Sequence, residues 1–397
     1  MSRVPGPAGV MFYSHDTYGL GHLRRTLTLA RFLPATRPLR SQLIVTGSPL
    51  AHRFQLPPLT DYVKLPSVLK TGAEHYEARY LRMPFAHVRD LRADMLLSTA
   101  RHLRPELLIV DNVPSGMKGE LLPTLRYLHE QDCRLVLGLR DVLDEPDWVR
   151  KSWRRNGSYE LLDELYDLIL VYGRQDVYDV AAEYGFSPEA EAKTRYAGYL
   201  GHEPPARDPA AVRDELGLVT GRLVLVMAGG GGDGYALLRA VARASRRNGS
   251  RPDYDLLLLG GPLMPREDRR KVLAIAAGDP AIRYLDFTED VASYVAAADA
   301  IVSMGGYNSV CELLSAGKCA LVVPRIRPRR EQLIRAEALS RLGVLRMLHP
   351  GELTATRVRA EIEQLLERPG AERMPLDGLP AAAAAIDELL GAEALQV

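Results

Sequence analysis

Short runs of Val, Ile and Leu alternate along the chain with longer stretches of helical periodicity. An uninterrupted apolar run of this kind is typical of a parallel strand that helices cover on both faces. The alternation restarts near the middle of the chain, so we expect an α/β protein with two Rossmann-like sheets. The expected strands are residues 10–13, 42–45, 62–65, 107–110, 135–139 and 168–171, and then residues 223–227, 256–259, 282–285, 300–303 and 320–323.

Prolines and charged residues crowd together in residues 202–209, a composition typical of a linker. The chain has 397 residues, which exceeds one ordinary domain of about 100–200 residues. We therefore place a domain boundary near Pro204 and expect an N-terminal domain of residues 1–203 and a C-terminal domain of residues 204–397. The alanine-rich tail at residues 380–390 is expected to form a closing helix.

The charge balance and the cysteines exclude several classes of protein. Lys and Arg number 51 against 50 Asp and Glu, so the net charge of +1 gives no general attraction to nucleic acid. The cysteines, Cys133, Cys311 and Cys319, lack the paired spacing of a disulfide framework or a zinc site. No apolar run reaches the roughly 18 residues of a membrane span, and no signal peptide is evident. We expect a cytoplasmic protein without a transmembrane segment, with peripheral attachment to a membrane left open.

Four consecutive glycines, Gly229, Gly230, Gly231 and Gly232, stand between an expected strand and an expected helix. Backbone without side chains can approach a phosphate closely at a helix N-terminus, and the stretch satisfies the G-x-G-x-x-G pattern. A dinucleotide site would also need an acidic residue at the end of the next strand, where this chain has Gly260. We therefore expect a diphosphate rather than NAD, with a plain surface turn as the alternative.

A second loop, with Gly305, Gly306, Asn308, Ser309 and Glu312, follows a later expected strand. Glycines at the strand end, Asn or Ser as the helix cap, and Glu312 in the first helical turn predict a site for phosphate and hydroxyl groups. A carboxylate there can accept both hydroxyls of a ribose. The alternative is a capping glutamate that answers Asn308 or Ser309.

Residues 303–317, the strand through Pro324 and residues 330–336 resemble the donor motif of glycosyltransferase family 28 and its relatives, which have the GT-B fold. The resemblance implies two Rossmann-like domains that face each other across a cleft, with a C-terminal helix that closes back. It also implies the donor contacts: Glu312 holds the ribose, Ser309 lies near the diphosphate, Glu331 and Gln332 meet the sugar hydroxyls, and Phe287 and Thr288 border the base through backbone atoms.

Two positions depart from the family pattern. Members often have two glutamines where this chain has Glu331 and Gln332, and an asparagine where it has Arg335, so the donor sugar is not assigned. Residues 325–330 also hold four arginines. Their guanidinium groups are suited to a diphosphate or an anionic acceptor, and a solvated loop is the alternative.

The loop after the first expected strand contains Gly19, Gly21 and His22. It is similar to the Gly-rich N-terminal loop with a Gly-His pair that many GT-B transferases place against the reacting centre. An acceptor must lose a proton as it attacks the anomeric carbon, and His22 is the first candidate for the base. A histidine that caps the helix or only binds the acceptor is the alternative. Asp111, at another strand end, is expected to orient His22, or merely to cap the turn that follows it.

Arg140 and Asp141 follow the expected strand at residues 135–139 and resemble a motif of predicted bacterial glycosyltransferases related to family 28. We interpret this pair as acceptor-side structure. The aromatic and basic residues 148–155 have the composition of an ordinary amphipathic surface helix, and we favour that over a lid or a membrane-facing helix.

Together these patterns predict a glycosyltransferase that moves a sugar from a nucleotide-diphosphate donor, UDP by resemblance, to an acceptor hydroxyl or amine with inversion. Helix N-termini and arginines can neutralise the departing diphosphate, so we expect no metal and no cofactor besides the donor. A non-hydrolysing nucleotide-sugar 2-epimerase and an inactive nucleotide-sugar-binding protein are the alternatives. The acceptor is expected to be a small molecule or lipid-linked.

Overall fold

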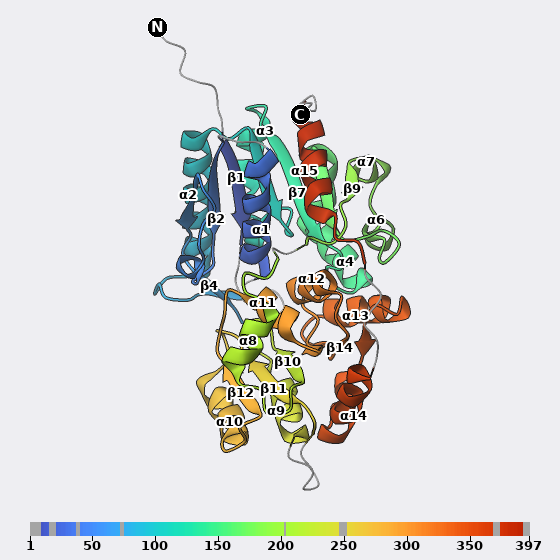
Figure 1. Ribbon diagram of the computed structural model, residues 1–397. Helices are drawn as coiled ribbons and strands as arrows, with labels where there is room; N and C mark the ends of the chain where they lie inside the picture. The colour runs from blue at the N-terminus through green and yellow to red at the C-terminus, as the bar shows by residue number, and fades with distance from the viewer. Residues whose placement is uncertain are drawn as a thin grey trace. The chain divides into compact units, whose positions relative to one another are not determined.

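The computed structural model describes residues 9–15, 21–36, 40–71, 75–201, 204–245, 252–367 and 374–391. The chain forms two compact units, each described here by itself (Figure 1). Unit 1 consists of Met1–Leu200 together with Asp377–Val397, and unit 2 consists of Gly201–Leu376.

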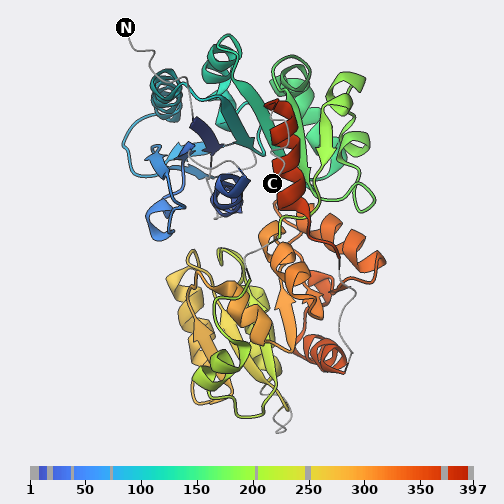
Figure 2. The same cartoon turned by 45° about the horizontal axis from the view of Figure 1, so that its top comes forward.

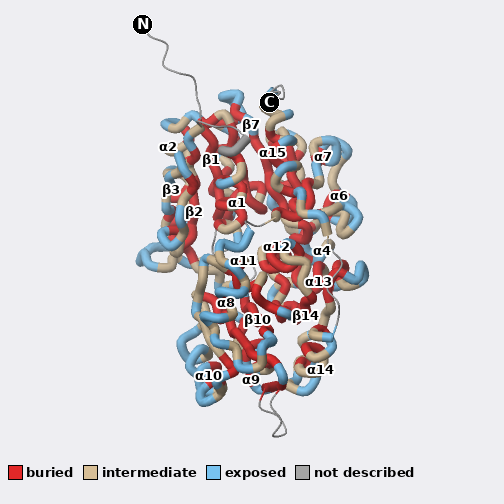
Figure 3. Tube along the Cα trace, in the orientation of Figure 1, coloured by how far each residue is buried: buried red, intermediate tan, exposed pale blue. Residues whose placement is uncertain are grey.

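Unit 1 is built on a parallel sheet of seven strands in the order β3-β2-β1-β6-β7-β8-β9. Strand β1 lies between β2 and β6, so that Val10 is in register with Gln42 on one side and Leu107 on the other. Every residue of β1 is buried (Figure 3). The strands are β1 (Gly9–Ser14), β2 (Ser41–Thr46), β3 (Thr60–Lys64), β6 (Leu107–Asp111), β7 (Arg134–Arg140), β8 (Leu168–Tyr172) and β9 (Thr194–Tyr196).

The helices of unit 1 pack on this sheet through apolar side chains. Leu96 and Leu125, from two successive helices, share one core cluster with Met11 of β1. The helices are α1 (Gly21–Thr36), α2 (Phe85–Leu103), α3 (Leu122–His129), α4 (Pro146–Asn156), α5 (Ser158–Glu164), α6 (Val180–Tyr184), α7 (Pro188–Ala192) and α15 (Gly378–Leu389), with short 3-10 turns at Ala51–Arg53 and Met117–Gly119.

Unit 2 is built on a parallel sheet of six strands in the order β12-β11-β10-β13-β14-β15. Its central strand β10 is fully buried, again because apolar side chains on both faces meet helices. The strands are β10 (Leu223–Met227), β11 (Asp255–Leu259), β12 (Ile282–Leu285), β13 (Ala300–Ser303), β14 (Ala320–Val322) and β15 (Arg346–Met347). The helices are α8 (Pro209–Leu216), α9 (Tyr235–Ala244), α10 (Arg266–Ala276), α11 (Val291–Ala297), α12 (Tyr307–Ala316), α13 (Glu331–Arg341) and α14 (Ala355–Leu366), with a 3-10 turn at Pro350–Glu352.

The expected α/β class with two parallel sheets is confirmed, and each expected strand is present. The structure adds two short edge strands, β9 and β15, and an antiparallel hairpin of β4 (Val68–Lys70) and β5 (Tyr76–Ala78). The alternation of apolar runs could not reveal these elements, because each strand has only two or three residues.

The C-terminal helix differs from the sequence-based assignment in its location. The tail does form a helix, α15, but residues from Asp377 onward cluster with unit 1 and not with the expected domain of residues 204–397. In Figure 2 this red helix lies among the strands and helices of unit 1, and it packs on α1 and β8. Gly378 permits the approach, since a Cβ there would lie 2.4 Å from the carbonyl oxygen of Tyr199. The buried side chains of Ala382 and Ile386 complete the contact.

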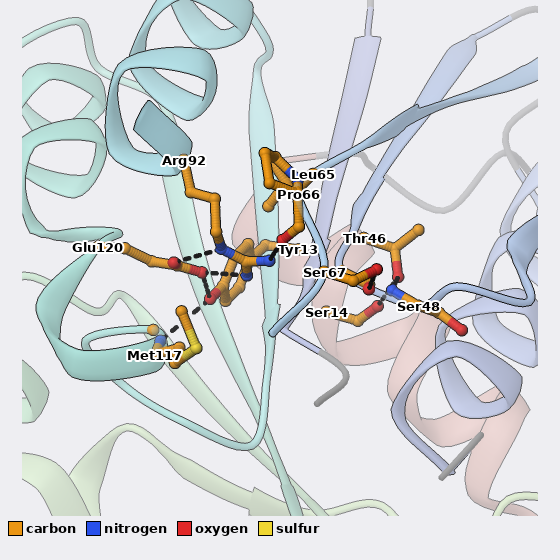
Figure 4. A network of polar contacts seen from close by, with 12 residues as sticks. Tyr13, Ser14, Thr46, Ser48, Leu65, Pro66, Ser67, Arg92, Met117 and Glu120 are labelled. Atoms are coloured by element: carbon orange, nitrogen blue, oxygen red, sulfur yellow. Dashed lines mark hydrogen bonds and ion pairs between the residues drawn. The ribbon is translucent and has the colours of Figure 1, made fainter. Parts of the chain in front are cut away.

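A buried ion pair fixes the loops at one end of the unit 1 sheet (Figure 4). Arg92 of α2 donates from Nε to Glu120 Oε2 at 2.6 Å, and from Nη2 to Glu120 Oε1 at 2.6 Å. The hydroxyl of Tyr13 also donates to Glu120 at 2.6 Å, and Arg92 Nη1 donates to the carbonyl of Pro66 at 2.7 Å. Both side chains of the pair are fully buried. One carboxylate therefore ties β1, α2 and, through Arg92, the loop after β3.

Candidate functional site

The strand ends of unit 1 bring His22 and Asp111 together. His22 lies in the first turn of α1, which follows β1, and Asp111 is the last residue of β6. These two strands are neighbours in the parallel sheet, so their carboxyl ends share one edge. His22 Nδ1 lies 2.5 Å from Asp111 Oδ2. The structure thus shows the pair that the sequence predicted, while the chemical role of His22 stays a prediction.

Arg25 completes this cluster. It donates from Nε to Asp111 Oδ1 at 2.8 Å and from Nη2 to Asp111 Oδ2 at 2.7 Å, and it is 2% exposed. Burial alone would raise the pKa of Asp111, but the charge of Arg25 and the hydrogen bonds of His22 and Arg25 hold it well below its usual range. Sequence analysis missed Arg25, although its spacing of three residues from His22 places both on one helix face.

This arrangement determines which nitrogen of His22 is available for chemistry. An ionised carboxylate only accepts hydrogen bonds, so Nδ1 must carry the proton that lies between the two side chains. Nε2 of a neutral imidazole is then the nitrogen that can take up a proton. The ring of His15 lies beside that of His22, with centroids 4.3 Å apart.

The neighbouring strand end positions Arg140 through backbone structure. Asn112 adopts a left-handed conformation with φ of 69° and donates from its backbone N to Gly138 at 2.7 Å. Arg140 Nε donates to the side-chain oxygen of Asn112, Oδ1, at 3.1 Å. Asp141 is buried and accepts hydrogen bonds from Val142 N at 2.8 Å and from Tyr199 at 3.2 Å. Asp141 therefore has a structural role.

Of the two glycines predicted beside His22, the structure describes only Gly21. Gly19 lies outside the described residues. Gly21 is the first residue of α1, where a Cβ would meet nothing within 4 Å. The close packing of the helix start does not require a glycine at this position.

In unit 2, the glycine run packs against the loop that follows β11. A Cβ on Gly231, whose φ is 87°, would lie 2.2 Å from the carbonyl oxygen of Gly260. A Cβ on Gly261, with φ of 88°, would lie 2.5 Å from the carbonyl oxygen of Gly229. Leu263 N also donates to the carbonyl of Gly230 at 2.9 Å. The glycine run is thus a packed turn, and the mutual approach of the two backbones requires a glycine at Gly231 in the run and at Gly261 in the facing loop.

Gly229 is the one exposed member of the run, whereas Gly230, like Gly232, is half-buried. The φ of Gly229 is 61°, and nothing lies within 4 Å of a Cβ built there. Gly229 and Gly232 both precede α9, so they stand where a helix N-terminus can meet an anion.

The loop after β13 corrects the capping that the sequence predicted. The N-cap of α12 is Gly306, with no side-chain cap hydrogen bond, and Asn308 and Ser309 lie inside the helix. Glu312 is therefore in the second turn, and it is 4% exposed. A capping glutamate must stand three residues after the N-cap, so that alternative for Glu312 is wrong. A glycine N-cap leaves the backbone amides at this helix start without a side-chain acceptor from the cap.

Gly305 shapes this helix start. Its φ is 72°, and a Cβ there would lie 2.5 Å from Val322 Cγ1 of the next strand. Arg335 is buried in α13, donates from Nη1 to the carbonyl of Gly305 at 3.2 Å, and lies over the ring of Tyr307 at 5.7 Å. The arginine that departs from the family pattern thus supports the turn that opens α12.

Glu331 and Gln332 begin α13 and face Arg325, from the loop after β14. Arg325 donates from Nη2 to Glu331 Oε1 at 2.5 Å and from its backbone N to Gln332 Oε1 at 2.9 Å. It also reaches Asp233, at the end of the glycine run, with Nη1 to Oδ2 at 3.2 Å. One arginine therefore joins two of the predicted donor loops within unit 2.

Phe287 and Thr288 lie in the loop after β12, next to the packed glycines. Gly261 N donates to the carbonyl of Asp286 at 2.9 Å, and Thr288 Oγ1 accepts from Asp290 N at 3.1 Å. Both predicted base-contacting residues are half-buried. Their loop therefore lies at the same sheet edge as the glycine run.

The chain has an Asp-x-Asp sequence at Asp253 and Asp255, at the amino end of β11. Some metal-dependent sugar transferases use such a pattern. Asp255 accepts hydrogen bonds from Val219 N at 3.0 Å and from Thr220 Oγ1 at 2.7 Å, and it pairs with Arg283 at 3.0 Å. These contacts give it a structural role at the edge opposite the predicted donor loops. Among the described residues, no group of three or more His, Cys, Asp or Glu is arranged to hold a metal ion.

Residues 223–387 match the model of the glycosyltransferase family 28 C-terminal domain. The resemblance drawn from the residues around Glu312 is thereby confirmed. The family 28 domain contains every strand-end loop of unit 2 described above, from the glycine run to the start of α13.

Two curated relatives share the name UDP-N-acetylglucosamine-N-acetylmuramyl-(pentapeptide) pyrophosphoryl-undecaprenol N-acetylglucosamine transferase. The chain is 32% identical to the protein of Rubrobacter xylanophilus over 34% of its length and 29% identical to that of Sorangium cellulosum over 63%. It spans 38% and 62% of the length of these relatives.

Solved structures resemble the chain over nearly its whole length. MurG of Acinetobacter baumannii has a TM-score of 0.56 at 14% identity, covering 96% of this chain and 95% of that one. A putative UDP-N-acetylglucosamine 2-epimerase from Listeria monocytogenes has a TM-score of 0.64 at 15% identity, covering 99% and 98%. At these identities the likeness shows the fold, which is GT-B. Within the described residues, no helix is both long and apolar enough to cross a membrane.

Proposed function

We propose that the chain is a glycosyltransferase that moves a sugar from a UDP-sugar, bound by the family 28 domain in unit 2, to an acceptor bound by unit 1. The observation that carries the proposal is the glycine-capped start of α12 inside a family 28 domain, with Glu312 buried one turn further along. The curated relatives are named as transferases that use a UDP-sugar. The family model and these relatives favour transfer over epimerisation.

The donor chemistry follows from groups at the strand ends of unit 2. A helix start capped by glycine presents backbone amides and the positive end of the helix dipole to a diphosphate. Glu312 offers a carboxylate for the two hydroxyls of the ribose. Glu331 and Gln332 are assigned to the sugar hydroxyls, and Phe287 and Thr288 to the base. With the backbone amides of a helix start facing the diphosphate, the proposed reaction needs neither a metal nor a second cofactor.

The transfer step uses the neutral imidazole of His22. As the acceptor hydroxyl attacks C1 of the sugar, Nε2 takes its proton, the new C1–O bond forms, and the bond from C1 to the diphosphate oxygen breaks. UDP leaves with that electron pair, and C1 inverts. Asp111 stabilises the imidazolium that results, and a base positioned in this way contributes about 10²–10⁴-fold to the rate.

A thermal-shift panel of nucleotide sugars tests donor binding, because a ligand bound only by the folded state raises the melting temperature. We expect UDP and a UDP-sugar to stabilise the chain and NAD to have no effect. Incubation of that donor with lipid and aqueous extracts in parallel should then release UDP with one of them, which separates a lipid-linked from a small-molecule acceptor.

Product analysis of the same incubation distinguishes the remaining functions. Free UDP formed only with acceptor supports transfer. An isomerised donor would support an epimerase, and tight UDP binding with no turnover, unchanged by His22→Ala, would support a binding protein.

A further inference from the structure

Arg325 lies between two carboxylates that belong to separate loops of unit 2. Its Nη2 is 2.5 Å from Glu331 Oε1, at the start of α13, and its Nη1 is 3.2 Å from Asp233 Oδ2, at the end of the glycine run. Its backbone N holds the side chain of Gln332 at 2.9 Å. One residue thus contacts both side chains that the family resemblance assigns to the donor sugar.

The contact with Glu331 is the stronger of the two. The Glu331 side chain is 4% exposed and that of Asp233 is 40% exposed. An exposed ion pair is screened by water and contributes little, whereas a buried carboxylate depends strongly on the cation that faces it. Burial opposes the charge of Arg325, yet Glu331 and Asp233 together raise its pKa. Arg325 therefore acts mainly through Glu331.

The partner of Glu331 suits a carboxylate at this position, where the family pattern that the sequence resembles often has a glutamine. A buried amide needs no counter-ion, whereas a buried carboxylate does. The two groups also differ toward a ligand, because an amide both donates and accepts hydrogen bonds and a carboxylate only accepts them. Glu331 with Arg325 is therefore a different recognition group from glutamine alone.

We propose that Arg325 is a positioning residue for donor-sugar recognition, which holds the Glu331 carboxylate in a fixed orientation toward the sugar hydroxyls. The inference rests on the proposed function of unit 2 as the donor domain. A fixed carboxylate accepts hydrogen bonds from the hydroxyls of a neutral hexose and repels a hexuronate. The substrate class is therefore a nucleotide-linked neutral sugar.

Titration calorimetry with UDP-N-acetylglucosamine, and with UDP as the reference, tests the positioning role. We expect Arg325→Met to weaken UDP-N-acetylglucosamine about tenfold or more and UDP less than about threefold, because Glu331 meets only the sugar. The affinity of the double variant Arg325→Met/Glu331→Gln for UDP-N-acetylglucosamine should recover to within about threefold of that of Glu331→Gln, since a glutamine at this position does not need the cation. Arg341→Met, which replaces an exposed arginine at the end of α13, the helix that Glu331 begins, is the control and should leave both affinities unchanged.

Two results would overturn the positioning role: an equal loss of affinity for both ligands in Arg325→Met, or no recovery in the double variant. If Arg325→Met does not fold, Arg325→Lys keeps the charge without the two-pronged contact. It should still lose affinity for UDP-N-acetylglucosamine more than for UDP. An unaltered chain that binds neither ligand would instead refute the donor site itself.

UDP-glucuronate tests the substrate class. Compared with UDP-glucose, it should bind the unaltered chain at least about tenfold more weakly, and this ratio should shrink in Glu331→Gln, which removes the repelling charge. Equal binding of the two donors by the unaltered chain would overturn the preference for a neutral sugar.

Discussion

Asp111→Asn removes the charge that both His22 and Arg25 face in unit 1. Arg25 is 2% exposed and donates two hydrogen bonds to this carboxylate, so the substitution leaves a buried guanidinium without its counter-ion. Removing one partner of a buried ion pair costs about 3–5 kcal/mol. We therefore expect unit 1 of the Asp111→Asn variant to lose a comparable amount of unfolding free energy at pH 7.

Tryptophan fluorescence during urea unfolding reports on unit 1 alone. The chain has two tryptophans, Trp148 and Trp153, and both lie in α4. The matched control is Asp176→Asn, which breaks an Asp–Arg pair whose carboxylate side chain is 62% exposed. That pair should contribute less than about 1 kcal/mol. A loss below about 1 kcal/mol in Asp111→Asn would refute the argument that the buried pair stabilises unit 1.

The pH dependence gives this prediction a sign. The pKa of Asp111 is depressed in the folded state, so its contribution is fully present above the ordinary carboxyl pKa and is lost as the pH falls toward the folded-state value. The stability difference between the unaltered chain and Asp111→Asn should therefore shrink as the pH falls below about 4. A difference that grows as the pH falls below about 4 would contradict the assigned direction.

The turnover of the folded Asp111→Asn variant tests the catalytic role of the pair separately from its contribution to stability. If His22 is the base, folded Asp111→Asn should lose turnover by about 10²–10⁴-fold, as the imidazolium loses its stabilising charge. Unchanged turnover in the folded variant would exclude the pair from catalysis.

Three further substitutions test other parts of the structure. Glu120→Gln should destabilise unit 1 by about 3–5 kcal/mol in the fluorescence assay, because it leaves the fully buried Arg92 without a charged partner; a loss near zero would contradict this. Gly261→Ala should lower the melting temperature of unit 2, because its φ is 88° and its Cβ would approach Gly229, a strain of at least about 1–3 kcal/mol. Gly229→Ala is the control and should lower the melting temperature less, because a Cβ at Gly229 has open space. Glu312→Gln should weaken UDP about tenfold by calorimetry, and unchanged affinity would exclude the ribose assignment.

The strands could be predicted from the sequence because each buried strand is an unbroken apolar run, and the order of the runs fixes a parallel sheet. The location of the C-terminal tail could not be predicted from the sequence. The alanines of α15 predict a helix, but they do not state which sheet that helix covers, and its packing on α1 and β8 depends on the close approach at Gly378. The pairing of His22 with Asp111 was predictable because both stand at the ends of neighbouring strands.

What the sequence could not supply are the partners that lie outside the motifs. Glu331 and Arg335 read as departures when they are compared one position at a time with the family pattern. In the structure each departure has a local cause: Arg325 faces Glu331, and Arg335 supports the Gly305 turn. The glycine run shows the opposite situation: its residues formally match a dinucleotide-binding motif, but Gly231 is a glycine because the backbone of Gly260 and Gly261 lies too close for a Cβ. A motif residue is therefore best assigned to ligand binding only after its protein contacts have been accounted for. By that criterion Gly229, whose φ is positive and whose Cβ position is open, is a stronger candidate for a diphosphate contact than Gly231.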